Sequence, residues 1–247
     1  MFLKAACFCF DENFKTEKMK LKLMVVLLLL LTSNFYAQKS VQQYEFKKGE
    51  VLDILLISNT KKDFNKLFDR YKKTIFPVGV KYSFTPQKGF KTGELILGSY
   101  LPKSLIFGKW ENIVKREQFL NVIEKEVPDF HEQRRRLFTH FELAYYEIQS
   151  DIKFEINRNK YNVVTSFWKN NKKSEKFIKD WIQEVEKSGG KIIIKLANGK
   201  SPLGYYYNPT LVTIVTWETK QAFQSFLKRH PLSTYKDLKH VHQFVID

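Results

Sequence analysis

The chain has 247 residues, of which 43% are hydrophobic, and its 42 Lys and Arg exceed its 26 Asp and Glu to give a net charge of +16. A chain of this length and composition buries a real core, in one large domain or in two of about 100 residues, which excludes a disordered or fibrous protein. The positive surplus favours acidic partners, such as nucleic acid, anionic lipid or polysaccharide, without choosing among them.

The N-terminal segment has the three-part layout of a secretory signal peptide. A basic stretch begins at Met19, an unbroken apolar run covers residues 23–31, and a polar exit leads to Ala37. The apolar run is shorter than the roughly 20 residues that cross a bilayer, so residues 1–37 are predicted to be a cleaved signal, with an uncleaved anchor as the alternative. Acidic residues before Met19 suit a signal peptide badly and suggest that Met19 is the true start.

Export narrows the expected partners and chemistry. Both cysteines, Cys7 and Cys9, precede Met19, so the predicted mature chain has no disulfide, thiol nucleophile or cysteine-ligated zinc. A periplasmic or extracellular protein rarely meets nucleic acid. The basic balance therefore indicates solubility or contact with an anionic envelope polymer, and no membrane span is expected after signal cleavage.

The mature chain is predicted to form strand, helix, strand, strand, helix and strand, twice over. The first copy has a β-rich run at 51–57, a helical stripe from Phe64 to Ile75 closed by Pro77, extended segments at 81–85 and 95–100, and a strand at 104–109 that runs into Trp110. A helix over 115–126, interrupted at Pro128, precedes a last strand at 141–148.

The second copy repeats this order. Its elements are predicted as a strand at 161–168, a helix capped by Ser174 and stopped by Gly189-Gly190, strands at 191–196 and 211–217, a helix at 220–229, and a strand at 241–246. The segments ending at Trp110-Glu111 and Trp217-Glu218 match best, because each ends a strand before an amphipathic helix. The sequence thus predicts two homologous repeats, residues 45–150 and 160–247, joined by a linker near 149–160.

This order of elements, with the Gly189-Gly190 exit and the strand ending at Trp217-Glu218, resembles the dimeric α+β barrel superfamily, and most of all its members without an assigned activity. The resemblance implies an α+β fold of two ferredoxin-like βαββαβ repeats that pair into an intrachain barrel. It also implies a monomeric pseudo-dimer or a homodimer. Fold alone says little about activity in such a superfamily.

The stretch that begins at Trp217 resembles the haem-degrading monooxygenases of this superfamily. Those enzymes use an Asn on the first strand, a Trp on the second helix and an axial His ten residues later. Asn162 matches the first of these, but Phe226 and Lys236 stand at the other two positions. No cofactor is therefore expected, and haem stays a minor alternative.

Strand alternation indicates which side chains share a face. Asp53 shares one with Val51, Leu55 and Ile57, and Asn162 shares one with Val164, Ser166 and Trp168. A polar residue on an otherwise apolar face can orient a ligand, although Asp53 and Asn162 are also near strand ends, where water would solvate them. The candidate ligand-cavity residues are Asp53, Trp110, Asn162, Ser166, Trp168, Trp217 and His240.

A cluster of arginines and a pair of histidines are two further candidate sites. Arg134, Arg135 and Arg136 form the densest positive cluster, a candidate anion site or simply a solvated helix face. His240 and His242 have a spacing compatible with a metal, but no further ligand accompanies them, so no metal site is predicted.

No serine triad, glycine-rich phosphate loop or zinc-protease pattern occurs in the sequence, so whether the protein is an enzyme stays open. The sequence predicts an exported α+β barrel protein that binds a small apolar or aromatic ligand or a partner. The alternative is a cofactor-independent or haem-degrading monooxygenase or isomerase of the same superfamily.

Overall fold

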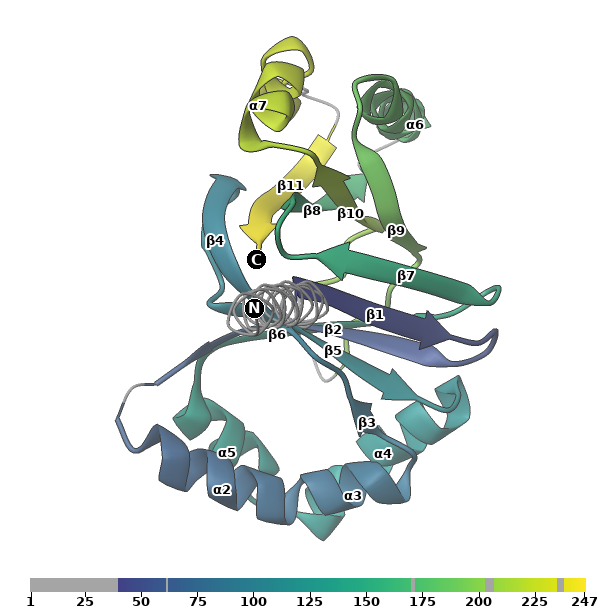
Figure 1. Cartoon of the computed structure of the whole chain (residues 1–247). Coiled ribbons are helices and arrows are strands. Elements are labelled where there is room, and N and C mark those ends of the chain that lie inside the picture. The colour runs from purple at the N-terminus through teal and green to yellow at the C-terminus, as the bar shows by residue number, and fades with distance from the viewer. Residues whose placement is uncertain (1–39, 61, 170–171, 203–206, 235–237) are drawn as a thin grey trace, which may run out of the picture. The chain divides into compact units, whose positions relative to one another are not determined.

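The computed structural model describes residues 40–60, 62–169, 172–202, 207–234 and 238–247. The predicted signal peptide and Met19 lie outside these residues, so export stays a prediction. Residues 42–247 form one compact unit of antiparallel strands and helices (Figure 1). Within the described residues, none of the helices has the length and apolar character needed to span a membrane.

The first series of elements covers residues 51–147. Its members are β2 (Val51–Asn59), α2 (Phe64–Thr74), α3 (Phe76–Lys81), β3 (Thr85–Pro86), β4 (Phe90–Leu97), β5 (Ser104–Trp110), α4 (Ile113–Glu126), α5 (Phe130–Leu137) and β6 (Phe138–Glu147). The strands lie in the order β6-β2-β5-β4, every pair is antiparallel, and β3 also pairs with β5.

The second series covers residues 161–246. Its members are β8 (Tyr161–Lys169), α6 (Lys172–Lys187), β9 (Lys191–Ala197), β10 (Leu211–Trp217), α7 (Lys220–Arg229), the short 3₁₀ turn η1 (Leu232–Thr234) and β11 (Leu238–Ile246). Here the strands lie in the order β11-β8-β10-β9, again antiparallel. In both series the last strand pairs with the first strand, as β6 does with β2 and β11 does with β8. The first strand also pairs with the strand that precedes the second helical segment, which is β5 in the first series and β10 in the second.

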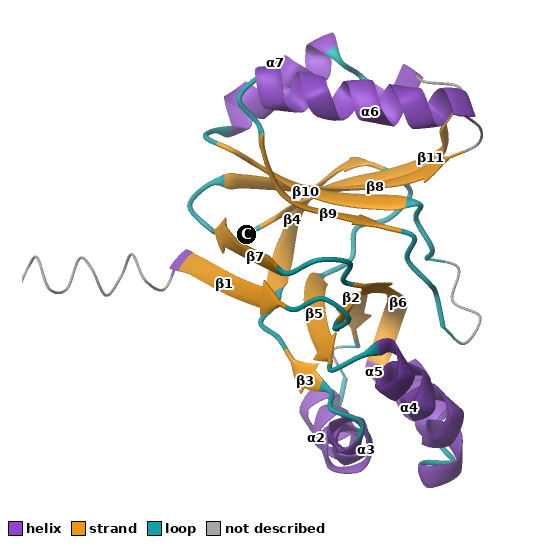
Figure 2. Ribbon diagram, turned by 90° about the vertical axis from the view of Figure 1, so that its right-hand side faces the viewer, coloured by secondary structure: helices purple, strands orange, loops and turns teal. Residues whose placement is uncertain are grey.

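Strand β4 joins the two series into one nine-stranded curled sheet. Its first residues pair with β5, where Phe90 lies opposite Leu105, and its later residues pair with β11, where Leu97 lies opposite Gln243. The predicted mixed α+β class is therefore confirmed. The helices cover the outer faces, with α6 and α7 on one side of the strands and α2–α5 on the other (Figure 2).

The structure corrects three details of the predicted elements. Pro77 does not close a helix but lies in the first turn of α3, where a missing N–H costs nothing. Residues 81–84 are not extended, because α3 ends at Lys81 and Ser83 turns the chain with φ 68°, so only Thr85 of the predicted segment 81–85 belongs to a strand, the short β3. The expected linker at 149–160 contains β7 (Ile152–Asn157), which forms a separate two-stranded sheet with β1 (Val41–Phe46).

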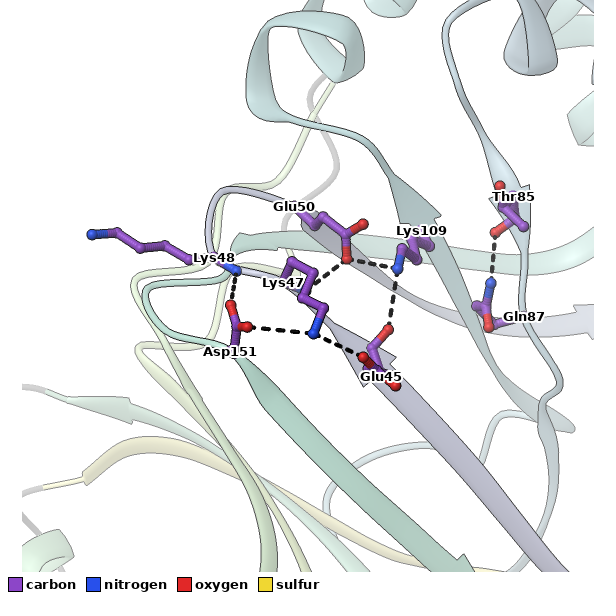
Figure 3. Close-up of polar contacts among 8 residues, drawn as sticks. All are labelled: Glu45, Lys47, Lys48, Glu50, Thr85, Gln87, Lys109 and Asp151. Atoms are coloured by element: carbon purple, nitrogen blue, oxygen red, sulfur yellow. Dashed lines mark hydrogen bonds and ion pairs between the residues drawn. The ribbon is translucent and has the colours of Figure 1, made fainter.

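Charged side chains connect the turn after β1 to β5 and to the residue before β7 (Figure 3). Lys109 Nζ on β5 lies 2.6 Å from Glu50 Oε2 and donates to the carbonyl of Glu45. The backbone N–H of Lys48 donates to Asp151 Oδ1 at 2.8 Å. These contacts hold β1 and β7 against the first-series sheet.

The two faces of β2 contribute side chains to two different hydrophobic clusters. Leu52, Ile54 and Leu56 are fully buried in a cluster that also contains residues of β1, β7, β8, β10 and β11. Val51 belongs instead to a cluster with α2–α5, and a third cluster lies beneath α6 and α7. The space between the strands of the two series is thus filled largely by apolar side chains.

Candidate ligand cavity

A cavity of about 390 Å³ lies between the first-series sheet and helices α2–α5. Ten of the described residues that line it are aromatic, among them Phe68, Phe84 and Phe138. Asp53, Leu55 and Ile57 of β2 line it as well, because alternate residues of a strand point to one face. This space is called the aromatic cavity below.

A buried ion pair forms part of the wall of the aromatic cavity. Arg116 Nε on α4 donates to Asp53 Oδ1 on β2 at 3.0 Å, and the two side chains are only 1% and 4% exposed. Asn112 caps α4 by accepting from the Lys115 N–H, which fixes the first turn of the helix that carries Arg116. Gly108 lies opposite Asp53 on β5, where an added Cβ would lie 2.8 Å from the Phe84 ring.

Aromatic rings surround the Arg116 guanidinium. Its Cζ lies 4.8 Å from the centre of the Trp110 ring and 4.9 Å from that of Tyr145, distances at which the cation is attracted to the ring faces. Even so, two buried donors in this wall, Arg116 Nη1 and Trp110 Nε1, have no hydrogen-bond partner within the described part of the chain. An unpaired buried donor costs about 1–3 kcal/mol.

A second arginine reaches the aromatic cavity from α5. Arg134 is 8% exposed, its Nε donates to the Tyr71 hydroxyl at 3.3 Å, and its guanidinium carbon lies 4.1 Å and 4.4 Å from the rings of Phe130 and Phe141.

The three arginines of the predicted positive cluster do not share one surface, and anion binding by them stays a prediction. Arg135 and Arg136 are exposed, whereas Arg134 is buried in the cavity wall. Successive residues of a helix point about 100° apart, so three consecutive arginines cannot share one face.

The predicted ligand residues separate into two groups. Asp53 and Trp110 line the aromatic cavity, whereas the other five, all in the second series, do not. Asn162 is fully buried, and its amide nitrogen donates to the carbonyls of Asn157 and Lys160. It therefore stabilises the turn between β7 and β8. Trp217 packs in the core against Phe226, the residue at the position where the haem-degrading enzymes have Trp.

The remaining three of these residues lie near a buried polar cluster. Ser166 Oγ lies 2.6 Å from the Tyr207 hydroxyl, and the Trp168 ring lies 4.8 Å from that of His240. Nearby, His242 Nε2 donates to the carbonyl of Tyr100 at 3.0 Å.

Burial governs the charge state of this polar cluster. Burial, together with the smaller effects of the neighbouring His240 and His140, lowers the pKa of His242 to about 4, so the ring is neutral at pH 7. Burial also raises the pKa of Tyr100, whose hydroxyl is hydrogen-bonded to Glu142. Among the residues that the structure describes, no three His, Cys, Asp or Glu side chains are placed to hold a metal ion.

Sequence reasoning missed Arg116, the residue that pairs with Asp53. One signal was available. Arg116 lies three residues before Phe119, so the two side chains occupy one face of α4, and α4 begins shortly after Trp110. An arginine on a helix is ordinarily expected to face solvent, so this signal is weak.

No family model matches the chain, and no curated protein matches it in sequence. Among solved structures, an anthrone oxidase-like protein is 14% identical over 83% of this chain and 94% of its own, with a TM-score of 0.44. A provisionally named monooxygenase from Lactobacillus acidophilus NCFM is 11% identical over 81% of this chain and 94% of its own, with a TM-score of 0.40. A mutant chlorite dismutase from Candidatus Nitrospira defluvii is 10% identical over 82% of this chain and 93% of its own, with a TM-score of 0.46. Likeness at this level decides neither the family nor the activity of this chain.

Proposed function

We propose that the protein binds a small, predominantly apolar molecule in the aromatic cavity. The observation that carries the proposal is the cavity itself, which has about 390 Å³ of space, a mostly apolar wall with ten aromatic residues, and a few buried polar groups. Ligand sites in proteins are typically concave, apolar and furnished with a small number of orienting polar groups. The space lies beneath α2–α5 and not between the strands of the two series, where apolar side chains fill the core.

We infer that the two series are ferredoxin-like repeats, residues 45–150 and 160–247, that pair into an intrachain barrel. The shared element order and the shared order of strands within the sheet support this assignment. The layout of residues 19–37 supports export to the periplasm or beyond, where an anionic envelope polymer is a further candidate partner through the basic surface.

A second candidate function is a cofactor-independent monooxygenase or isomerase. One observation favours it: a carboxylate, Asp53, lies in the cavity wall. A carboxylate there can accept a proton from a bound molecule, provided that a substrate reaches it despite the ion pair with Arg116. Turnover that disappears in Asp53→Asn, while binding persists, would favour this candidate over a binding protein.

The binding proposal is tested with the neutral fluorescent probe N-phenyl-1-naphthylamine, titrated into the purified protein. We expect saturable binding at one site, and strong loss of affinity in Leu55→Trp, because the larger side chain fills the cavity from β2. Leu101→Trp is the matched control, since Leu101 is 38% exposed and does not line the cavity. Absence of saturable binding, or equal affinity in Leu55→Trp, contradicts the proposal.

A further inference from the structure

Two hydrogen-bond donors in the wall of the aromatic cavity have no acceptor among the described residues. They are Arg116 Nη1 and Trp110 Nε1, and both atoms are buried. They are neighbours, because the Arg116 guanidinium carbon lies 4.8 Å from the centre of the Trp110 ring. Buried donors in folded proteins are nearly always paired, so the two donors point to a ligand that brings an acceptor.

The charges beside these donors favour a neutral acceptor. Asp53 Oδ1 accepts from Arg116 Nε at 3.0 Å, so this ion pair has no net charge. A ligand carboxylate at Nη1 would bring a second negative charge to the guanidinium that already neutralises Asp53, and two carboxylates that share one buried site repel each other. A neutral oxygen accepts the same hydrogen bonds without this repulsion. Arg134 lies on α5, where it donates to the Tyr71 hydroxyl, and it is not needed for these hydrogen bonds.

A carbonyl oxygen suits the two donors better than a hydroxyl group does. It has two lone pairs and no hydrogen, so it can accept from a guanidinium and from an indole N–H at the same time. A hydroxyl group brings a hydrogen that needs a further acceptor, and a buried donor without one costs free energy.

The floor of the aromatic cavity indicates where the rest of such a ligand lies. Asp53, Leu55, Ile57 and Asn59 of β2 all line the cavity, and six residue steps along a strand cover about 20 Å. The donors are at the Asp53 end of this floor, because Arg116 is bonded to Asp53. A ligand with its oxygen at this end extends its apolar body over Leu55 and Ile57.

We propose that the ligand is a neutral apolar molecule with a carbonyl oxygen at one end. The carbonyl oxygen accepts hydrogen bonds from Arg116 Nη1 and Trp110 Nε1, and the apolar body follows β2. This inference rests on the proposed binding function and adds to it the chemical class of the ligand.

The test compares three probes that have the same rings and a side group of the same size: the ketone 2-acetylnaphthalene, the hydrocarbon 2-isopropylnaphthalene and the anion 2-naphthoate. Each is titrated at pH 7 against the protein loaded with N-phenyl-1-naphthylamine, and the concentration that displaces half of the fluorescent probe is measured. We expect the ketone to act at about tenfold lower concentration than naphthoate, because the anion meets the Asp53 carboxylate. Displacement by naphthoate at an equal or lower concentration overturns the neutral class and leaves the binding function intact. Failure of the fluorescent probe to bind overturns the binding function itself.

Variants test the hydrogen bonds separately from the shape of the cavity. Trp110→Phe keeps an aromatic ring but removes the N–H. We expect the half-displacing concentration of the ketone to rise about fivefold, the usual effect of one hydrogen bond, and that of the hydrocarbon to stay within about twofold. Trp168→Phe is the matched control, because Trp168 does not line the cavity, and it should change neither value.

The double variant Asp53→Asn/Arg116→Met removes the second donor together with both buried charges. It should also weaken the ketone relative to the hydrocarbon. Equal shifts of the ketone and the hydrocarbon in Trp110→Phe and in the double variant contradict the assignment. If the double variant does not fold, Trp110→Phe alone decides.

Discussion

The guanidinium of Arg116 and the carboxylate of Asp53 connect a helix to the sheet beneath it through one hydrogen bond of 3.0 Å, with both side chains almost completely buried. The pair lies at the edge of a cavity whose other lining residues are mainly apolar, half of them aromatic. It therefore serves the packing of α4 on β2 and shapes the polar end of the candidate site.

Removal of one partner of the ion pair should lower the free energy of unfolding more than removal of both partners together. Arg116→Met leaves the Asp53 carboxylate buried without its partner, and we expect a loss of about 3–5 kcal/mol in the free energy of unfolding. Asp53→Asn/Arg116→Met removes both charges and should lose clearly less. Urea denaturation followed by circular dichroism at pH 7 measures both values.

An exposed ion pair provides the control for this comparison. Lys72→Met breaks the pair with Asp69, in which both side chains are about half exposed, and should cost no more than about 1 kcal/mol. A double variant as unstable as Arg116→Met would show that the pair does not act as a unit.

His242 should make the protein less stable in acid. Its pKa is about 4 in the folded protein, because the ring is buried, against an ordinary value of 6.5. As pH falls from 6.5 to 4 the unfolded chain takes up a proton that the folded chain does not, so the free energy of unfolding should drop by about 3 kcal/mol from this group alone.

The measurement is the unfolding free energy of His242→Gln and of the parent protein between pH 7 and pH 4. The variant should lose less stability over this range than the parent. His131→Gln, at a half-exposed position on α5, should follow the parent. Identical pH profiles for His242→Gln and the parent would show that folding does not lower the pKa of His242.

Gly98 should tolerate alanine much less well than Gly189. Both have positive φ values, 131° and 89°, but a Cβ at Gly98 would lie 2.7 Å from His242 Cδ2, whereas a Cβ at Gly189 meets nothing within 4 Å. We expect Gly98→Ala to destabilise the protein by at least about 1 kcal/mol more than Gly189→Ala, because a collision adds to the backbone strain. Thermal unfolding of the two variants compares them directly, and equal losses would mean that His242 moves aside at no cost.

Two helix caps separate effects on stability from effects on binding. Asn112 caps α4 and Thr219 caps α7, each by accepting from a backbone N–H three residues later. Asn112→Ala and Thr219→Ala should each cost about 1 kcal/mol. Only Asn112→Ala should weaken binding of N-phenyl-1-naphthylamine, because α4 carries Arg116 and Phe119 into the cavity wall. Equal probe affinities in both variants would separate α4 from the site.

Much of the fold was predictable because the spacing of apolar residues along the sequence indicates strands and helices. Alternation placed Asp53, Leu55 and Ile57 on one face of β2, and that face is the one that lines the cavity. Strand β7 was missed although its residues alternate between charged and apolar, Lys153-Phe154-Glu155-Ile156, as in a half-buried strand. Its partner β1 lies about 100 residues earlier in the chain, and this pairing is not visible in the local pattern.

The candidate site was predictable only in part. Asp53 and Trp110 come from strands, whose faces can be read from a period of two, but the cavity also depends on how far α2–α5 stand from the sheet. That distance results from the packing of aromatic side chains and cannot be read from one sequence. Arg134 illustrates the limit, because its burial between Phe130 and Phe141 follows from tertiary packing, while its two arginine neighbours remain exposed.

Nuclear Overhauser effects between bound N-phenyl-1-naphthylamine and methyl-labelled protein show most directly whether the aromatic cavity under α2–α5 is a ligand site. We expect contacts from the probe to the methyl groups of Leu55, Ile57 and Ile106, which line the cavity. We expect none to Ile178 or Val185, which are buried residues of α6 itself. Contacts confined to the second series, or no contacts at saturating probe, would contradict binding in this cavity.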